Sequence, residues 1–135
     1  MDYSKFFTTL SLDQKDIQIS DPRVLRSLLI LMNQHAVNGG AACHWGGPAA
    51  IVEIISALYS IFYQDENWKE KFHLINDIGH AENAFYALRA LYQEDEMTLE
   101  ELKGFRSLNS RLTGHGESHV NPKQILLSNG PLGSS

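Results

Sequence analysis

The sequence holds a single cysteine, Cys43, so one chain can form neither an internal disulfide nor a cysteine-based metal cluster. Positive charge is also scarce, and a formal net charge of -5 without any basic block disfavours nucleic-acid binding. The longest apolar stretch, around 51–63, carries Glu53 and is too short to span a bilayer. The first residues lack the basic start and apolar run of a signal peptide. These absences favour a cytoplasmic protein that binds neither nucleic acid nor membrane.

What remains is the composition of a soluble globular protein. The 135 residues suffice for one domain with a core, and 43% of them are hydrophobic while 20% are charged. Residues 1–20 show no sustained period, which predicts a leader segment with a short turn of helix at 11–15. The domain itself is expected over 21–135.

Two helices are predicted in the first half of this domain. Asp21 followed by Pro22 is typical of a helix start, and this helix should run to about Val37, before two glycines stop it. The second helix is predicted over 48–63, opened by a proline. Its expected apolar face consists of Ile51, Ile54, Ile55, Leu58, Ile61 and Phe62.

The second half contains shorter elements. A strand is predicted over 72–75 and a third helix over 81–92. Thr98, with Glu101 three residues on, is typical of the cap of a fourth helix ending near residue 105. An irregular stretch then leads to an apolar run at 125–127, a second strand. Strands separated by helices indicate an α/β fold, helix-rich with short parallel strands, and this chain resembles part of a larger layered domain.

Four of the six histidines lie beside glycine-bearing turns, and His80 carries the strongest physical argument. It follows a predicted strand and begins a helix, the place where open α/β sheets bind ligands. A helix N-terminus attracts phosphate and disfavours the imidazolium, so His80 is expected to be a neutral hydrogen-bond donor. The alternative is a residue that only caps the helix. The other three histidines beside glycine-bearing turns are His44, His115 and His119.

Each of these three also has a plainer interpretation. His44 packs against Trp45 in a loop, and His115 and His119 lie in a solvated one. A zinc site is disfavoured because the two histidines separated by three residues fall in a glycine-bearing loop rather than on a helix.

Taken together, four segments resemble the N-terminal part of the transketolase family, whose members use thiamine diphosphate. CHWGGP at 43–48 is similar to a GHPGxPLG loop, and NDIGH at 76–80 to a strand that ends in NGH. The stretch 102–117 resembles the family's L…FRQLxSxxPGHPE segment. SNGPLGS at 128–134 resembles its TTGPLGQG loop.

The resemblance implies roles for individual residues. His44 would face the substrate and move protons, and His115 would hydrogen-bond the donor sugar near its carbonyl. His80 would contact the cofactor diphosphate. Gly130 and Leu132 would line the thiamine site, with Leu132 packed on the rings. No metal ligand is assigned in this chain.

Some positions depart from the family pattern. Trp45 replaces a proline, Ala42 and Cys43 replace Ser-Gly, and Gly116 replaces another proline, so the sugar specificity is open. The stretch 77–80 also resembles deoxyxylulose-phosphate synthase, and the homodimeric pyruvate dehydrogenase E1 is a further relative.

The family's Gly-Asp-Gly motif, which holds Mg²⁺ and the diphosphate, is not in the sequence. This suggests a truncated form, a proteolytic fragment or one part of a split enzyme, inactive alone, with residues 21–135 forming a partial thiamine diphosphate-binding domain. The implied activity is ketol transfer between sugar phosphates, with Mg²⁺ and a homodimer or a partner chain that carries the remaining domain. The alternatives are a non-catalytic helical binding or regulatory module and, more distantly, a zinc module.

Overall fold

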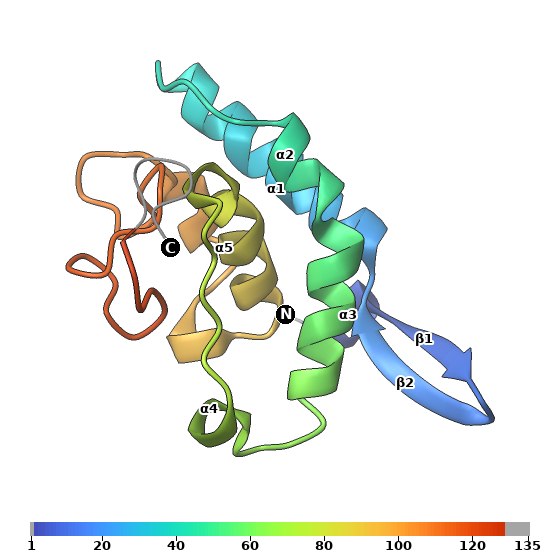
Figure 1. Cartoon of the computed structure of the whole chain (residues 1–135). Helices are drawn as coiled ribbons and strands as arrows, with labels where there is room; N and C mark the ends of the chain where they lie inside the picture. Colours follow the sequence, from blue (N-terminus) through green and yellow to red (C-terminus); the bar gives the residue numbers. More distant parts are fainter. Residues whose placement is uncertain (1, 129–135) are drawn as a thin grey trace.

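Figure 1 shows the computed structural model of the chain, in which residues 2–128 are described. Helices gather around α5, a β-hairpin projects at one side, and a long irregular segment follows on the other. No helix in this part of the chain has the length and apolar character needed to cross a membrane. The elements are η1 Tyr3–Phe6, β1 Phe7–Leu12, β2 Lys15–Ser20, α1 Pro22–Asn38, α2 Gly46–Ala50, α3 Val52–Phe62, α4 Trp68–Lys71, η2 Gly79–Ala81, α5 Glu82–Leu91, η3 Glu94–Glu96 and η4 Glu101–Gly104.

Helix α1 confirms the helix predicted from Pro22 to about Val37. The Asp21 side chain accepts a hydrogen bond from the Arg23 amide at 2.9 Å, and Pro22 opens the helix. At the other end, the Gly39 amide donates to the His35 carbonyl at 3.1 Å. The buried apolar side chains repeat at helical spacing and form one side of the core: Leu25, Leu29, Met32 and Ala36.

The second predicted helix is divided into α2 and α3 at Ile51, and its buried face differs from the prediction. Ile54 and Ile61 are 68% and 62% exposed. Tyr59 determines the rotation of α3, because its ring is buried and its hydroxyl donates to Glu94 at 3.1 Å. The residues buried on α3 are Val52, Ile55, Ser56, Tyr59 and Ser60.

An aromatic cluster closes the end of α3. Phe62 stacks on Trp68 of α4, with ring centroids 4.9 Å apart and an interplanar angle of 12°. Phe72 stacks on the other side of Phe62 at 5.5 Å. Trp68 is buried, so this stack fixes the turn between α3 and the segment that leads to α5.

Helix α5 confirms the helix predicted over 81–92, and the turn η2 leads into it. Every residue of α5 is buried, because α1, α3 and the irregular C-terminal segment surround it. The fourth predicted helix is reduced to the single turn η4. Its cap is as expected, since the Thr98 hydroxyl accepts from the Glu101 amide at 3.2 Å. The Glu101 carboxylate pairs with Arg111 instead of completing a capping box.

The strands differ from the prediction. Among residues 2–128 the sheet is the antiparallel pair β1–β2, with Phe7 opposite Ser20 and Leu12 opposite Lys15. The helical turn expected at 11–15 is wrong: Asp13 and Gln14 adopt left-handed φ values of 47° and 65° and form the hairpin turn.

The short parallel strands expected at 72–75 and 125–127 are not formed in the described residues, although the fold is the helix-rich α/β arrangement that was predicted. Phe72 has an extended backbone, with φ −133° and ψ 141°. A strand also needs a neighbour for its ladder of hydrogen bonds, and no described strand lies beside either segment.

Candidate functional site

Three of the predicted histidines meet. The ring centroid of His44 lies 5.0 Å from that of His80 and 5.7 Å from that of His115. They come from three separate segments: the loop before α2, the turn η2 and the irregular C-terminal segment. Trp45, directly after His44, is 40% exposed beside this cluster. The structure thus brings both predicted catalytic residues together with one predicted cofactor contact.

The surroundings of His44 disfavour its protonated form. Loss of solvent, followed by the charges of His80, His115 and Arg106, holds the pKa of His44 below its ordinary value. Burial raises the pKa of the neighbouring Cys43 thiol, and the Arg106 charge opposes that rise. His44 is therefore neutral at neutral pH, in surroundings that attract an anionic ligand.

Two glycines allow this close approach. A Cβ at Gly47 would lie 3.2 Å from Nε2 of His80, and one at Gly114 would lie 2.3 Å from Nη1 of Arg106. Arg106 itself has a left-handed φ of 61°, and its amide donates to the Leu112 carbonyl at 2.9 Å. The glycines leave the space in which His80 and Arg106 lie against the backbone.

Two buried asparagines hold the loop of His44. Nδ2 of Asn33 donates to the His44 carbonyl at 2.8 Å, and Nδ2 of Asn83 donates to it at 3.1 Å. Asn83 also donates to Oδ1 of Asn33 at 3.0 Å. The His44 backbone is therefore tied to both α1 and α5.

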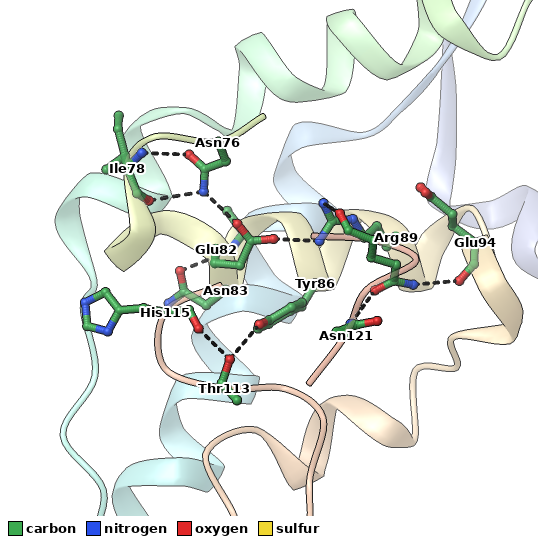
Figure 2. Close-up of polar contacts among 12 residues, drawn as sticks. Asn76, Ile78, Glu82, Asn83, Tyr86, Arg89, Glu94, Thr113, His115 and Asn121 are labelled. Carbon is green, nitrogen blue, oxygen red and sulfur yellow. Dashed lines mark hydrogen bonds and ion pairs between the residues drawn. The ribbon is translucent and has the colours of Figure 1, made fainter. Parts of the chain in front are cut away.

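Helix α5 also carries a buried ion pair between Glu82 and Arg89 (Figure 2). Oε1 of Glu82 is 2.6 Å from Nη1 of Arg89, and both side chains are about 4% exposed. Oε2 of Glu82 accepts from Nδ2 of Asn76 at 2.8 Å, and Arg89 donates to the Gln124 carbonyl at 3.0 Å. A Cβ at Gly116 would lie 3.3 Å from this carboxylate. The pair thus links α5 to the segments on either side of it.

The loop of His115 is held by hydroxyl groups. The Thr113 hydroxyl donates to the His115 carbonyl, and the Tyr86 hydroxyl lies 3.3 Å from that of Thr113 (Figure 2). Tyr86 is a fully buried residue of α5. Helix α5 therefore contributes to the placement of all three histidine-bearing segments.

The resemblance assigns no role to the other three histidines. His119 is exposed, with Nε2 3.3 Å from the Glu117 carboxylate, and His35 and His73 are exposed as well. Gly130 and Leu132, expected to line the thiamine site, lie outside the described residues. Between residues 2 and 128, no group of three or more His, Cys, Asp or Glu side chains is arranged to hold a metal ion.

Comparison with known proteins identifies the family. Residues 22–135 match the model of the family described as transketolase, thiamine diphosphate binding domain. The chain belongs to this family. The resemblance seen in the four sequence segments is thereby confirmed. No solved structure matches the chain.

Several transketolases are similar to this member of the family. Transketolase 2 of Escherichia coli (strain K12) is 32% identical over 113 residues, 81% of this chain and 17% of that protein. Transketolase of Dictyostelium discoideum is 32% identical over 106 residues, 76% of this chain and 16% of the relative. Transketolase of Scheffersomyces stipitis is 33% identical over 104 residues, which are 73% of this chain and 15% of the relative. The chain therefore spans about one sixth of the length of these transketolases.

Proposed function

We propose that this chain supplies part of the active site of a transketolase-like enzyme, which transfers a two-carbon ketol unit between sugar phosphates with thiamine diphosphate. The observation that carries the proposal is the meeting of His44, His80 and His115, three residues that the family resemblance had assigned to one site. Membership of the family supports the cofactor, and the similarity to transketolases supports the reaction.

The residues present fit an anionic group. Among the groups whose charges lower the pKa of His44, Arg106 is a permanent cation, and no carboxylate is among them. His80 lies in the turn η2, which leads into α5, so His80 and the helix end are suited to hold a diphosphate oxygen. Gly130 and Leu132 are proposed to line the thiamine rings. When bound, the cofactor supplies the electron sink that carbon–carbon bond cleavage requires.

The histidines would accept and donate protons and hydrogen bonds during the reaction. His44 is neutral near pH 7, so one of its imidazole nitrogens is able to accept a proton from a substrate hydroxyl and return it later. His115, held through its carbonyl by Thr113, would donate a hydrogen bond near the carbonyl oxygen of the donor sugar. The Arg106 charge favours a phosphorylated sugar over a neutral one.

The proposal includes components beyond these residues. Mg²⁺ would neutralise the diphosphate, held by ligands outside the present sequence, in which Gly-Asp-Gly does not occur. The proposal includes a homodimer, or a partner chain that carries the remaining domain, since the chain spans 17% of the Escherichia coli relative. The cytoplasm is the proposed location.

The test uses the enzyme assembled from this chain and whatever segment or partner carries the rest of the domain. His80→Ala removes one hydrogen bond to a charged oxygen, which should weaken thiamine diphosphate binding by about tenfold to hundredfold. His35→Ala, at an exposed position of α1, should leave the affinity unchanged. Titration calorimetry and the cofactor dependence of ketol transfer measure both variants, each checked by circular dichroism. A folded His80→Ala variant with unaltered affinity would refute the assignment of His80.

A further inference from the structure

The loop that carries His44 must be held in one conformation for the three histidine rings to stay together. Residues 41–45 form no regular secondary structure, and His44 itself is exposed. Its ring nevertheless contacts those of both His80 and His115, so it is the common member of the cluster. An exposed loop samples many backbone conformations, and this one must be restrained for the three rings to stay together.

The restraint is a pair of amide side chains on the core side of the loop. Asn33 on α1 is completely buried, and Asn83 on α5 is 1% exposed. Both donate to the same acceptor, the His44 carbonyl oxygen, at 2.8 and 3.1 Å. Hydrogen bonds shielded from water hold more strongly than exposed ones, and neither amide changes its charge with pH.

The two asparagines are themselves fixed. Nδ2 of Asn83 donates to Oδ1 of Asn33 at 3.0 Å, and Oδ1 of Asn83 accepts from the Ala84 amide at 3.0 Å. Each amide group therefore has one orientation in which all of these bonds are made. The asparagine pair is a rigid bridge between α1 and α5, with the His44 carbonyl at its end.

The backbone on either side of His44 is anchored as well. The Cys43 thiol donates to the Asn33 carbonyl at 3.7 Å, and the Trp45 carbonyl accepts from the Ala49 amide at 3.1 Å. Residues 43 to 45 are thus held at three consecutive points. Little backbone freedom remains between the anchors, so the position of the carbonyl also determines where the His44 ring lies.

Asn83 lies three residues after His80, at the first turn of α5. A bond from Asn83 to the His44 carbonyl therefore sets the distance between two of the three histidines. We propose that Asn33 and Asn83 are positioning residues, which hold His44 against His80 and His115 through its backbone carbonyl. The catalytic meaning of this role rests on the proposed function, whereas the geometry can be tested without cofactor or substrate.

The first measurement uses the unaltered 135-residue chain. The side-chain amide groups of Asn33 and Asn83 should exchange with solvent at least about tenfold more slowly than that of exposed Asn67, the factor that one net hydrogen bond is worth. A through-bond NMR coupling from each amide to the His44 carbonyl is expected. Rapid exchange of both amides without any coupling would overturn the proposal.

The second measurement compares variants. In Asn33→Leu and Asn83→Leu, the contacts seen by NMR between the His44 ring and the rings of His80 and His115 should weaken, and both should disappear in the double variant. The pKa of His44 should rise towards its ordinary value, because the ring regains solvent and moves away from His80, His115 and Arg106. Retention of the ring contacts and of the lowered pKa in the folded double variant would overturn the proposal.

Leu91→Ala is the matched control, since it removes a buried side chain at the opposite end of the same helix. It should destabilise the chain and leave the ring contacts and the His44 pKa unchanged; equal changes in this control would contradict a positioning role. If the double variant does not fold, the exchange measurement decides. Failure of thiamine diphosphate binding with the ring contacts intact would count against the proposed function alone.

Discussion

Helix α5 and the hairpin β1–β2 represent two extremes of burial in one small chain. All ten residues of α5 are buried, including a glutamate, an asparagine and an arginine. In β1 no residue is fully buried, and in β2 only Ile19 and Ser20 are. Helix α5 follows the turn of His80 directly and bonds to the His44 carbonyl through Asn83, whereas the hairpin lies at the side of the molecule, before the residues that match the family.

The polar groups of the two regions behave differently for this reason. In the hairpin, Gln18 donates to Thr9 at 2.7 Å where solvent competes for both groups. In α5, the charges of Glu82 and Arg89 are shielded from solvent, and each is compensated by the other. An exposed pair of charges contributes little to stability, whereas a buried charge without its partner is strongly destabilising. The comparison indicates that side chains on α5 both determine the stability of the chain and fix the site.

The largest effect is expected from breaking the buried pair. Glu82→Ala leaves Arg89 without its charged partner and should lower the free energy of unfolding by about 3–5 kcal/mol. Glu53→Ala on α3 breaks an ion pair with Arg26 whose side chains are 58% and 35% exposed, and should cost less than about 1 kcal/mol. Urea titration of both variants measures the difference. Equal losses would show that burial does not distinguish these pairs.

A smaller effect on stability is expected when the pH is lowered, because of His44, whose carbonyl is bonded to α5. The folded state holds the pKa of His44 below its ordinary value, so the unfolded state binds more protons as the pH falls through about 6.5. The stability due to neutral His44 is complete above that pH and is lost below it. Thermal unfolding between about pH 7.5 and 5 should therefore be less pH-dependent in His44→Gln than in the wild type. The same dependence in both proteins would contradict this assignment.

The smallest effect is expected in the hairpin. Leu12 is 58% exposed, and Leu12→Ser should change the free energy of unfolding by no more than about 0.5 kcal/mol. Leu88→Ala, at a completely buried position of α5, should cost about 2–5 kcal/mol. Chemical denaturation followed by circular dichroism compares the two. A loss above about 1 kcal/mol for Leu12→Ser would mean that the hairpin has a larger part in folding than its exposure indicates.

The helices could be predicted where local signals agree with burial. Asp21 and Pro22 mark the start of α1, and the helical period of α5 matches its surroundings. The period of α3 predicted the wrong face, because packing of the Tyr59 ring and its bond to Glu94 outweigh the burial of Ile54. Such contacts join residues far apart in the sequence and leave no local pattern.

The hairpin was missed for a different reason. Leu10, Leu12, Ile17 and Ile19 alternate with polar residues, which is a strand signal, but Asp13-Gln14 lacks the glycine typical of a tight turn. The extended segment at 72–75 was read as a strand from its composition, which cannot reveal whether a neighbour is present to complete a ladder.

The clustering of the three histidines could be predicted from the sequence. His44, His80 and His115 were selected by their glycine-bearing turns and the family resemblance, and the structure brings them together. The supporting residues, Asn33 and Asn83, were not selected. Asn33 lies four residues after Leu29 on a buried face, and such a polar residue is a signal that becomes specific only when its partner is known.

The chain carries two tryptophans, and their surroundings make them separate optical probes. Trp68 is 6% exposed within the stack of Phe62 and Phe72, so its emission should be blue-shifted and should change when the core unfolds. Trp45 is 40% exposed beside His44, so its emission should lie at longer wavelength and respond to a ligand or a proton at the cluster. Intrinsic fluorescence can therefore follow folding and occupancy of the site in one unlabelled sample.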